Sequence, residues 1–300
     1  MALTPDDLFA QIESLVMCHS PSGAECEINQ FLIEAFDALG VEHWRDDADN
    51  IIAKIPGRDE VEAAAQNRPS RAIAITAHKD EIGAIVKTVH EDGKISVRRL
   101  GGAFPWVYGE GVVDLLGDQK TVSGILCFGS RHVSHESPQK SLQEGQSVAW
   151  ENAWIETCQT ADELTQAGVR PGTRMVVGKH RKRPFRMGDT IASYTLDNKA
   201  SVAILLALAE RLKQPSQQPP VTVYLVASAK EEVGALGALY FTQRHSLEAL
   251  VALEICPFSE EYPIEAGPVP VLLSQDGYGV YDEGLNWQIR QAAAALETPL

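Results

Sequence analysis

The sequence predicts an α/β protein in which a strand-rich segment interrupts a larger domain of alternating helices and strands. Helix and strand patterns alternate before residue 82 and after residue 187, and several strand segments there are continuously apolar, as in a sheet covered on both faces. Between these positions short strands follow one another closely, which is typical of a small β-barrel or sandwich. We therefore expect an α/β domain made of residues 1–81 and 188–300, with residues 82–187 inserted.

The first part of the chain is expected to begin with two helices. Thr4 and Pro5 suit the N-cap and first position of a helix, and apolar residues then recur at helical spacing up to Val16. A second helix is predicted from Ser22, with Gly40 as its C-terminal stop. The next predicted elements are strands over 41–44 and 51–55, a polar loop over 56–70 and a buried strand over 71–77.

The inserted segment has the turn residues of a compact β structure. Asp92-Gly93 separates two strand-like runs, 84–89 and 94–99, which is a strong hairpin signal. Thr160 and Glu163 form a capping box that predicts a short helix. The other predicted strands are 112–116, 121–128, 153–157 and 174–177.

After Met187 the alternation of helix and strand returns. The predicted helices are 198–212, 234–244 and 282–295, and the predicted strands are 221–228, 249–256 and 270–273. The strands 221–228 and 249–256 are apolar enough to be buried.

Composition excludes several classes of protein. The 300 residues carry 26 basic and 41 acidic side chains, a net charge of -15, which argues against a nucleic-acid partner. The longest nearly apolar run, 200–209, is too short to cross a membrane. The five cysteines are scattered without a CxxC, and the first residues lack a signal peptide pattern. We expect a cytoplasmic protein with reduced thiols and no membrane partner.

Acidic and histidine residues gather at the ends of the predicted buried strands. In an open α/β sheet, functional sites form at the carboxyl ends of the strands. The residues concerned are His78 and Asp80 after strand 71–77, Glu231 and Glu232 after strand 221–228, Asp197 before helix 198–212, and Glu254 inside the apolar run 251–256.

Each of these residues has a purely structural interpretation when taken alone. His78 suits a hydrogen-bonded strand end, and Asp197 suits a helix N-cap. Glu231 and Glu232 suit the first turn of a helix, where the helix dipole favours negative charge. Glu254 would need a basic partner, since an unpaired buried carboxylate costs several kcal/mol.

Taken together, the same residues suit a site for two divalent cations. Imidazole binds Zn²⁺ or Co²⁺, and carboxylates can bridge two metals. Two dications carry a charge of +4, which Asp197, Glu232, Glu254 and a bridging hydroxide would balance. Asp80 is placed to orient the imidazole two residues away. Glu231 is not needed as a ligand in this scheme and is free to act as a general base.

The chain resembles the glutamyl and deblocking aminopeptidases that form tetrahedral (TET-type) particles, metallopeptidase family 42. The matching stretches are Pro21-Ser22-Gly23-Ala24-Glu25, His78-Lys79-Asp80-Glu81-Ile82-Gly83, Gly101-Gly102, Leu196-Asp197-Asn198-Lys199, and Glu231-Glu232-Val233-Gly234 with Gly237-Ala238. The resemblance implies a mixed-sheet, zinc-peptidase-like catalytic domain with an inserted β-barrel-like domain. It also implies a dinuclear aminopeptidase that acts on peptides and assembles into dimers or dodecamer-like particles.

The resemblance implies a role for each candidate residue. His78 and Glu254 would bind one metal, Glu232 the other, and Asp197 both; Asp80 would orient His78, and Glu231 would be the catalytic base. The family usually has Asp at the position of Glu254 and Gln at that of Lys230. Its last metal ligand is a histidine that would lie beyond Leu300. We therefore expect either that the given sequence is a fragment, whose catalytic domain lacks its C-terminal end, or that the second metal lacks one ligand.

Two other functions remain open at this point. The same ligands would serve a related metal-dependent amidohydrolase that acts on acylated amino acids, and substrate profiling would separate the two. A metal-poor, non-catalytic paralogue is the second alternative, supported by the missing histidine, and metal content would identify it.

Overall fold

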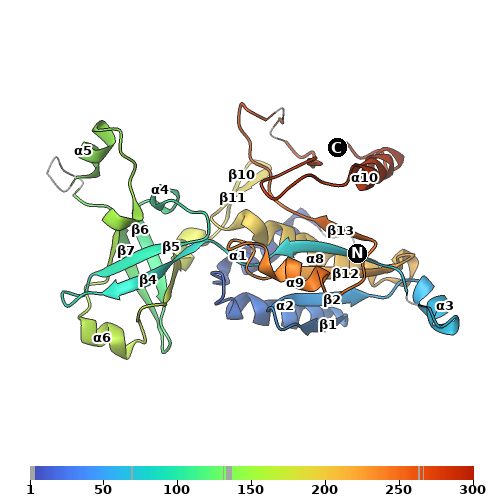
Figure 1. Ribbon diagram of the computed structural model, residues 1–300, viewed down its shortest axis with the longest axis horizontal. Helices are drawn as coiled ribbons and strands as arrows, with labels where there is room; N and C mark the ends of the chain where they lie inside the picture. Colours follow the sequence, from blue (N-terminus) through green and yellow to red (C-terminus); the bar gives the residue numbers. More distant parts are fainter. Residues whose placement is uncertain (1–3, 69, 131, 133–136, 263, 266) are drawn as a thin grey trace. The chain divides into compact units, whose positions relative to one another are not determined.

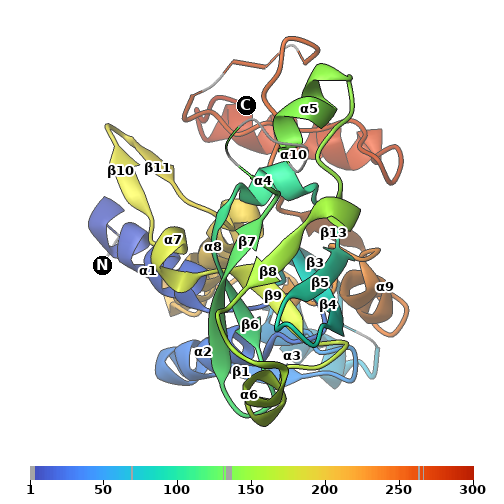
Figure 2. The ribbon, with the colours of Figure 1, turned by 90° about the vertical axis from the view of Figure 1, so that its left-hand side faces the viewer.

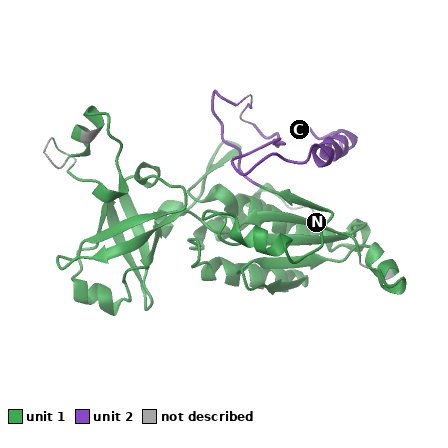
Figure 3. Ribbon diagram, in the orientation of Figure 1, with its two compact units in different colours: residues 1–253 green, residues 254–300 purple. Residues whose placement is uncertain are grey.

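The computed structural model describes residues 4–68, 70–130, 132, 137–262, 264–265 and 267–300. The chain divides into two compact units, residues 1–253 and 254–300, which are described separately (Figure 3).

The first unit is built on a mixed sheet with the strand order β1-β2-β12-β3-β13 (Figure 1). Its strands are β1 (Glu42–Arg45), β2 (Ile51–Ile55), β12 (Thr222–Ser228), β3 (Ala72–His78) and β13 (Ala249–Ala252). β12 runs parallel to β3 and antiparallel to β2, and β13 runs parallel to β3. The carboxyl ends of β3 and β12 therefore meet at one edge, where His78 pairs with Ser228.

Helices cover both faces of this sheet, because alternate residues of its strands are apolar on each side. α1 (Pro5–Met17), α2 (Cys26–Leu39) and α8 (Leu196–Leu212) share one apolar cluster with the sheet, which includes Ile51 and Leu225. On the other face, Phe241 of α9 (Leu236–Thr242) packs with Ile52 and Val226. The predicted α/β class is confirmed.

The first unit also contains a closed β-barrel (Figure 2). Its strands, in spatial order, are β4 (Gly83–Val89), β5 (Ile95–Leu100), β8 (Trp154–Glu156), β7 (Thr121–Cys127), β6 (Gly111–Leu116) and β9 (Arg174–Val177). The predicted capping box is present at the start of α6 (Ala161–Gln166). The barrel-like fold is confirmed; the boundaries at residues 82 and 187 stay predictions, and all the barrel strands lie between them.

The remaining elements complete the described chain. They are α3 (Asp59–Ala65), α4 (Pro105–Tyr108), α5 (Pro138–Gln143), η1 (Trp150–Asn152), α7 (Lys179–Lys182), the hairpin β10 (Phe185–Met187) and β11 (Thr190–Ala192), η2 (Pro215–Gln217) and α10 (Glu283–Ala295). α10 belongs to the second unit, where the Leu285 amide donates to the Asp282 side chain at 2.7 Å and so caps the helix.

Several predicted boundaries are wrong. α2 begins at Cys26 rather than Ser22, because residues 20–25 form a loop that bonds to residues 79–81. The expected loop over 56–70 contains α3, whose acidic first turn and following alanines favour a helix. The expected strand 249–256 ends at Ala252 and is only partly buried at the sheet edge, and 270–273 is not a strand.

Two further expectations concern the described residues. All five cysteines are free thiols. Among the residues described, no helix is both long enough and apolar enough to cross a bilayer.

Candidate active site

His78 lies at the carboxyl end of β3 with its side chain almost fully buried. Its Nδ1 donates to the carbonyl oxygen of Asp80 at 3.1 Å. This bond leaves a lone pair on Nε2, which faces Asp197 Oδ1 at 2.9 Å. Two acceptor atoms held this close require a proton or a cation between them.

Asp80 connects three segments of the site from a fully buried position. Its carboxylate accepts from the Ser22 hydroxyl at 2.6 Å and from the backbone amides of Glu231 and Glu232 at 2.9 and 3.3 Å. Oδ1 also lies 3.5 Å from Nδ1 of His78. Burial would raise the pKa of Asp80, but its bonds and the charge of His78 outweigh burial and lower it. Asp80 is therefore an anionic anchor between the ends of β3 and β12.

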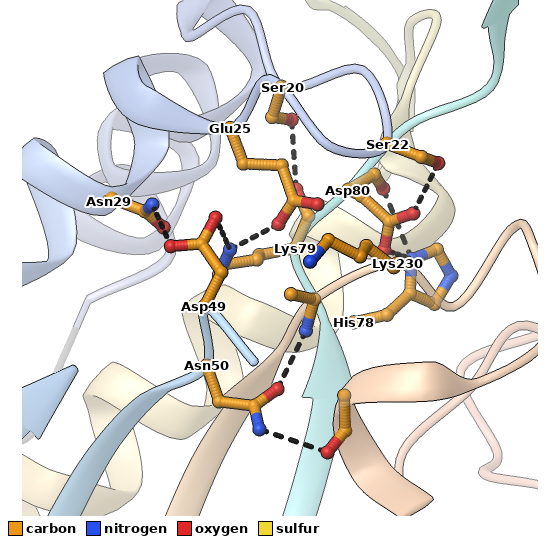
Figure 4. A network of polar contacts seen from close by, with 12 residues as sticks. Ser20, Ser22, Glu25, Asn29, Asp49, Asn50, His78, Lys79, Asp80 and Lys230 are labelled. Carbon is orange, nitrogen blue, oxygen red and sulfur yellow. Dashed lines mark hydrogen bonds and ion pairs between the residues drawn. The ribbon is translucent and has the colours of Figure 1, made fainter. Parts of the chain in front are cut away.

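The turn after β12 brings the two adjacent glutamates to this edge. Asn50 fixes the turn, since its side chain accepts from the Ala229 amide and donates to the carbonyl of Gly237, both at 2.9 Å (Figure 4). Glu231 Oε2 then lies 3.8 Å from Nε2 of His78. Glu232 follows, with its own amide bonded to Asp80.

Asp197 comes from the start of α8, where the backbone is not helical. Asp197 itself has φ -73° and ψ 106°, and its peptide bond to Asn198 is cis. The Asn198 side chain donates to the carbonyl of Leu253 at 2.8 Å, which attaches this segment to the end of β13. The Asp197 carboxylate faces His78 and does not act as the N-cap that the sequence alone would allow.

The structure brings His78, Asp197 and Glu232 together as a group that fits a divalent metal. Their ligand atoms lie within 4.8 Å of one another, and one nitrogen with two carboxylate oxygens is a suitable donor set for Zn²⁺. Burial, together with the negative charge of Asp197, raises the pKa of Glu232 to about 8. Crowded carboxylates of this kind are stabilised by a cation.

Glu254 is placed differently from the other candidates. It belongs to the second unit and is exposed, with its Oε1 accepting from the Ile255 amide at 2.7 Å. The expectation that it is buried in a strand is wrong, and its role as a metal ligand stays a prediction.

A buried polar network lies next to the site (Figure 4). Lys79 points away from His78 and Asp80, as strand alternation requires, and forms a close ion pair with Glu25. Both side chains are fully buried, and Asp49 Oδ2 lies 3.9 Å from the Lys79 nitrogen. Asn29 donates to Asp49 at 2.8 Å. This network ties the helical layer to the strand that carries His78.

Sequence reasoning missed two residues of the site. Ser22 and Gly101 were both noted only as parts of matching stretches, although the Ser22 hydroxyl donates to Asp80. Gly101 has φ +83°, and a Cβ there would lie 3.3 Å from Cβ of Glu232 and 3.4 Å from its Oε2. Lys230, the unusual cation expected near the site, donates to the carbonyl of Ala48 at 3.3 Å.

The chain is similar to known proteins in sequence and in fold. The chain is 26% identical to SgcX of Escherichia coli (strain K12) over 95% of its length and 71% of that protein. It superposes on a TET aminopeptidase from a marine sediment archaeon with a TM-score of 0.85 at 22% identity, covering 98% of this chain and 80% of the other. For the TET1 peptidase of Pyrococcus horikoshii the TM-score is 0.77 at 20% identity, covering 95% and 80%. At these identities the two structures establish the fold.

The family assignment comes from the match to a family model. The model of the M42 glutamyl aminopeptidases matches residues 59–300, which include the candidate metal ligands and the candidate base. The resemblance seen in the sequence motifs is therefore confirmed. The chain belongs to the M42 glutamyl aminopeptidase family, a family of peptidases.

Proposed function

We propose that this chain is a metal-dependent aminopeptidase that removes residues from the N-termini of peptides. The observation that carries the proposal is the convergence of His78, Asp197 and Glu232 with Glu231 beside them. The family match supports the reaction class. Two divalent ions per subunit, Zn²⁺ or Co²⁺, are proposed, with Glu254 as a further ligand and Asp197 shared between the ions.

The residues of the chain would divide the chemistry between them. Bound divalent ions would polarise the scissile carbonyl and lower the pKa of water to about 7. Glu231 would take a proton from the attacking water and return it to the leaving amine. Asp80 would hold the His78 imidazole with Nε2 available as a ligand. The carboxylates around the site would attract the protonated amine of a free N-terminus.

Substrate profiling tests this proposal. We expect faster release of the first residue from peptides with a free N-terminus than from the same peptides after N-acetylation, because the acetylated amine is neutral. Preferential cleavage of N-acyl amino acids would instead identify an amidohydrolase. A protein that binds no metal and cleaves neither substrate would be a non-catalytic paralogue.

Self-association is part of the proposal. The Pyrococcus horikoshii peptidase is described as assembling into a tetrahedron or a large octahedral shell. We propose that this chain, in the cytoplasm, also forms a dimer or a dodecamer-like particle through its barrel. Light scattering at micromolar concentration should give a mass of at least two chains, and a clean monomer would contradict this.

A further inference from the structure

A second ionic cluster lies beside the metal-ligand group and is centred on Glu81. The Glu81 carboxylate is buried, and Lys182 donates to its two oxygens at 2.7 and 2.6 Å. Lys199 lies 3.3 Å from Oε1, and the Ser20 amide donates to the same oxygen at 2.7 Å. The side chains of Lys182 and Lys199 are both completely buried.

The cluster connects the segments that carry the candidate ligands. Glu81 follows Asp80 directly and is three residues from His78, while Lys199 is two residues beyond Asp197. Lys199 also donates to the carbonyl of Cys18 at 2.6 Å, so its ammonium is held between two fixed acceptors. Both segments are therefore fastened to the same buried carboxylate, close to the point where His78 and Asp197 meet at 2.9 Å.

The cluster continues into the barrel through a chain of hydrogen bonds. Lys182 donates to Nδ1 of His19 at 3.0 Å, so His19 must carry its proton on Nε2, which lies 3.1 Å from Asp114. Asp114 belongs to β6 and also accepts from Ser123 of β7 at 2.7 Å. Lys182 thus connects Glu81 to the barrel, and Lys199 connects Glu81 to the segment that carries Asp197.

The charges show why Glu81 cannot be replaced without consequence. Two buried ammonium groups converge on one carboxylate, and each would repel the other if that carboxylate were neutral. Removal of one partner from a buried ionic group leaves the remaining charge uncompensated. Relaxation of Lys199 would then displace the backbone that carries Asp197, two residues away.

We propose that Glu81 is a positioning residue, which sets the separation of the metal ligands His78 and Asp197 by holding Lys199 in place. This inference rests on the proposed metal site. Residues that orient metal ligands typically change metal affinity by about 10–100-fold when they are replaced. A purely structural role would lower thermal stability and leave the affinity of the folded protein for metal unchanged.

Calorimetric titration with Zn²⁺ of the metal-stripped full chain tests the inference. Glu81→Gln and Lys199→Met should each raise the dissociation constant at least about tenfold. The matched control is Lys182→Met, which removes the equally buried partner that connects Glu81 to the barrel. This variant should change the dissociation constant for Zn²⁺ less than about threefold. Glu81→Gln should also lower kcat more than it raises KM, because the ligands and not the substrate contacts are displaced.

The double variant Glu81→Gln with Lys182→Met keeps the net charge of the cluster and serves if Glu81→Gln does not fold. It should show the same loss of Zn²⁺ affinity as Glu81→Gln. Unchanged affinity in folded Glu81 and Lys199 variants, or an equal loss in Lys182→Met, would overturn the inference. A wild-type chain that binds no Zn²⁺ would instead overturn the proposed metal site, so the two failures are distinguishable.

Discussion

Replacement of Glu231 by glutamine should separate catalysis from metal binding. The Glu231 backbone amide, and not its side chain, donates to Asp80, so Glu231→Gln keeps the turn in place. Its carboxylate lies 3.8 Å from Nε2 of His78 and is outside the group formed by His78, Asp197 and Glu232. The variant would therefore lose the proposed base without losing a proposed ligand of that group.

The expected effect is a fall in kcat of about 10²–10⁴-fold, the usual contribution of a general acid–base group. This fall corresponds to an increase of about 3–5 kcal/mol in the activation barrier. Glu232→Gln is the matched variant on the neighbouring residue, and it should instead weaken metal binding by at least about tenfold because it removes a proposed ligand.

Steady-state hydrolysis of aminoacyl p-nitroanilides and Zn²⁺ titration should be measured on both variants. Turnover by Glu231→Gln within about threefold of wild type would show that Glu231 is not the base. Loss of metal by Glu231→Gln would show that it is a ligand. Either result would refute the assignment of roles to the two glutamates.

Three other predictions concern the surroundings of the site. Glu25→Gln should lower the free energy of unfolding in urea by about 3–5 kcal/mol, because it leaves the completely buried Lys79 without its charged partner. Glu248→Gln, in the exposed pair with Arg71, should lower it by less than about 1 kcal/mol, and equal losses in the two variants would contradict the prediction. Burial would raise the pKa of Glu81, but Lys182 and Lys199 lower it to about 2 from 4.5, so its stabilising contribution is complete above pH 4.5 and is lost as the pH falls towards 2. Urea unfolding at successive pH values should show that the free energy of unfolding falls less steeply with acid in Glu81→Gln than in wild type. Parallel curves for the two proteins would contradict this prediction. Gly101→Ala should raise the dissociation constant for Zn²⁺ severalfold, because φ +83° is strained for alanine and the added Cβ would crowd Ile82 and Glu232. Gly102→Ala, whose Cβ would meet nothing within 4 Å, should leave the constant unchanged, and equal constants for the two variants would refute this prediction.

The sequence was sufficient to predict the sheet edge at which the candidate residues meet. Apolar runs ending at Ala77 and Ser228 gave the strands, and parallel strands have their carboxyl ends at one edge. The motif residues His78, Asp197 and Glu232 were therefore expected close together, and the structure places them so. The position of the Asp197 carboxylate next to His78 could not be predicted from the motif, because the backbone at the start of α8 is not helical there.

The polar support of the site could not be predicted from the sequence. Lysine is usually exposed to solvent, so the sequence predicts exposure for Lys79, Lys182 and Lys199. Burial of these side chains becomes favourable only through partners far away in the chain, such as Glu25 and Glu81. The interpretation of Glu254 failed for a related reason. An apolar run predicts burial only if another layer covers it, and β13 is a short strand at the sheet edge that ends before Glu254.

The dependence of hydrolysis on metal tests the proposed function most directly. The chain should be stripped with a chelator, and the release of N-terminal residues from a free-amine peptide should be measured before and after Zn²⁺ or Co²⁺ is added. We predict that the stripped protein is inactive and that activity returns in wild type but not in Glu232→Gln at the same metal concentration. Undiminished hydrolysis by the metal-free protein would contradict the proposal that His78, Asp197 and Glu232 hold a catalytic ion.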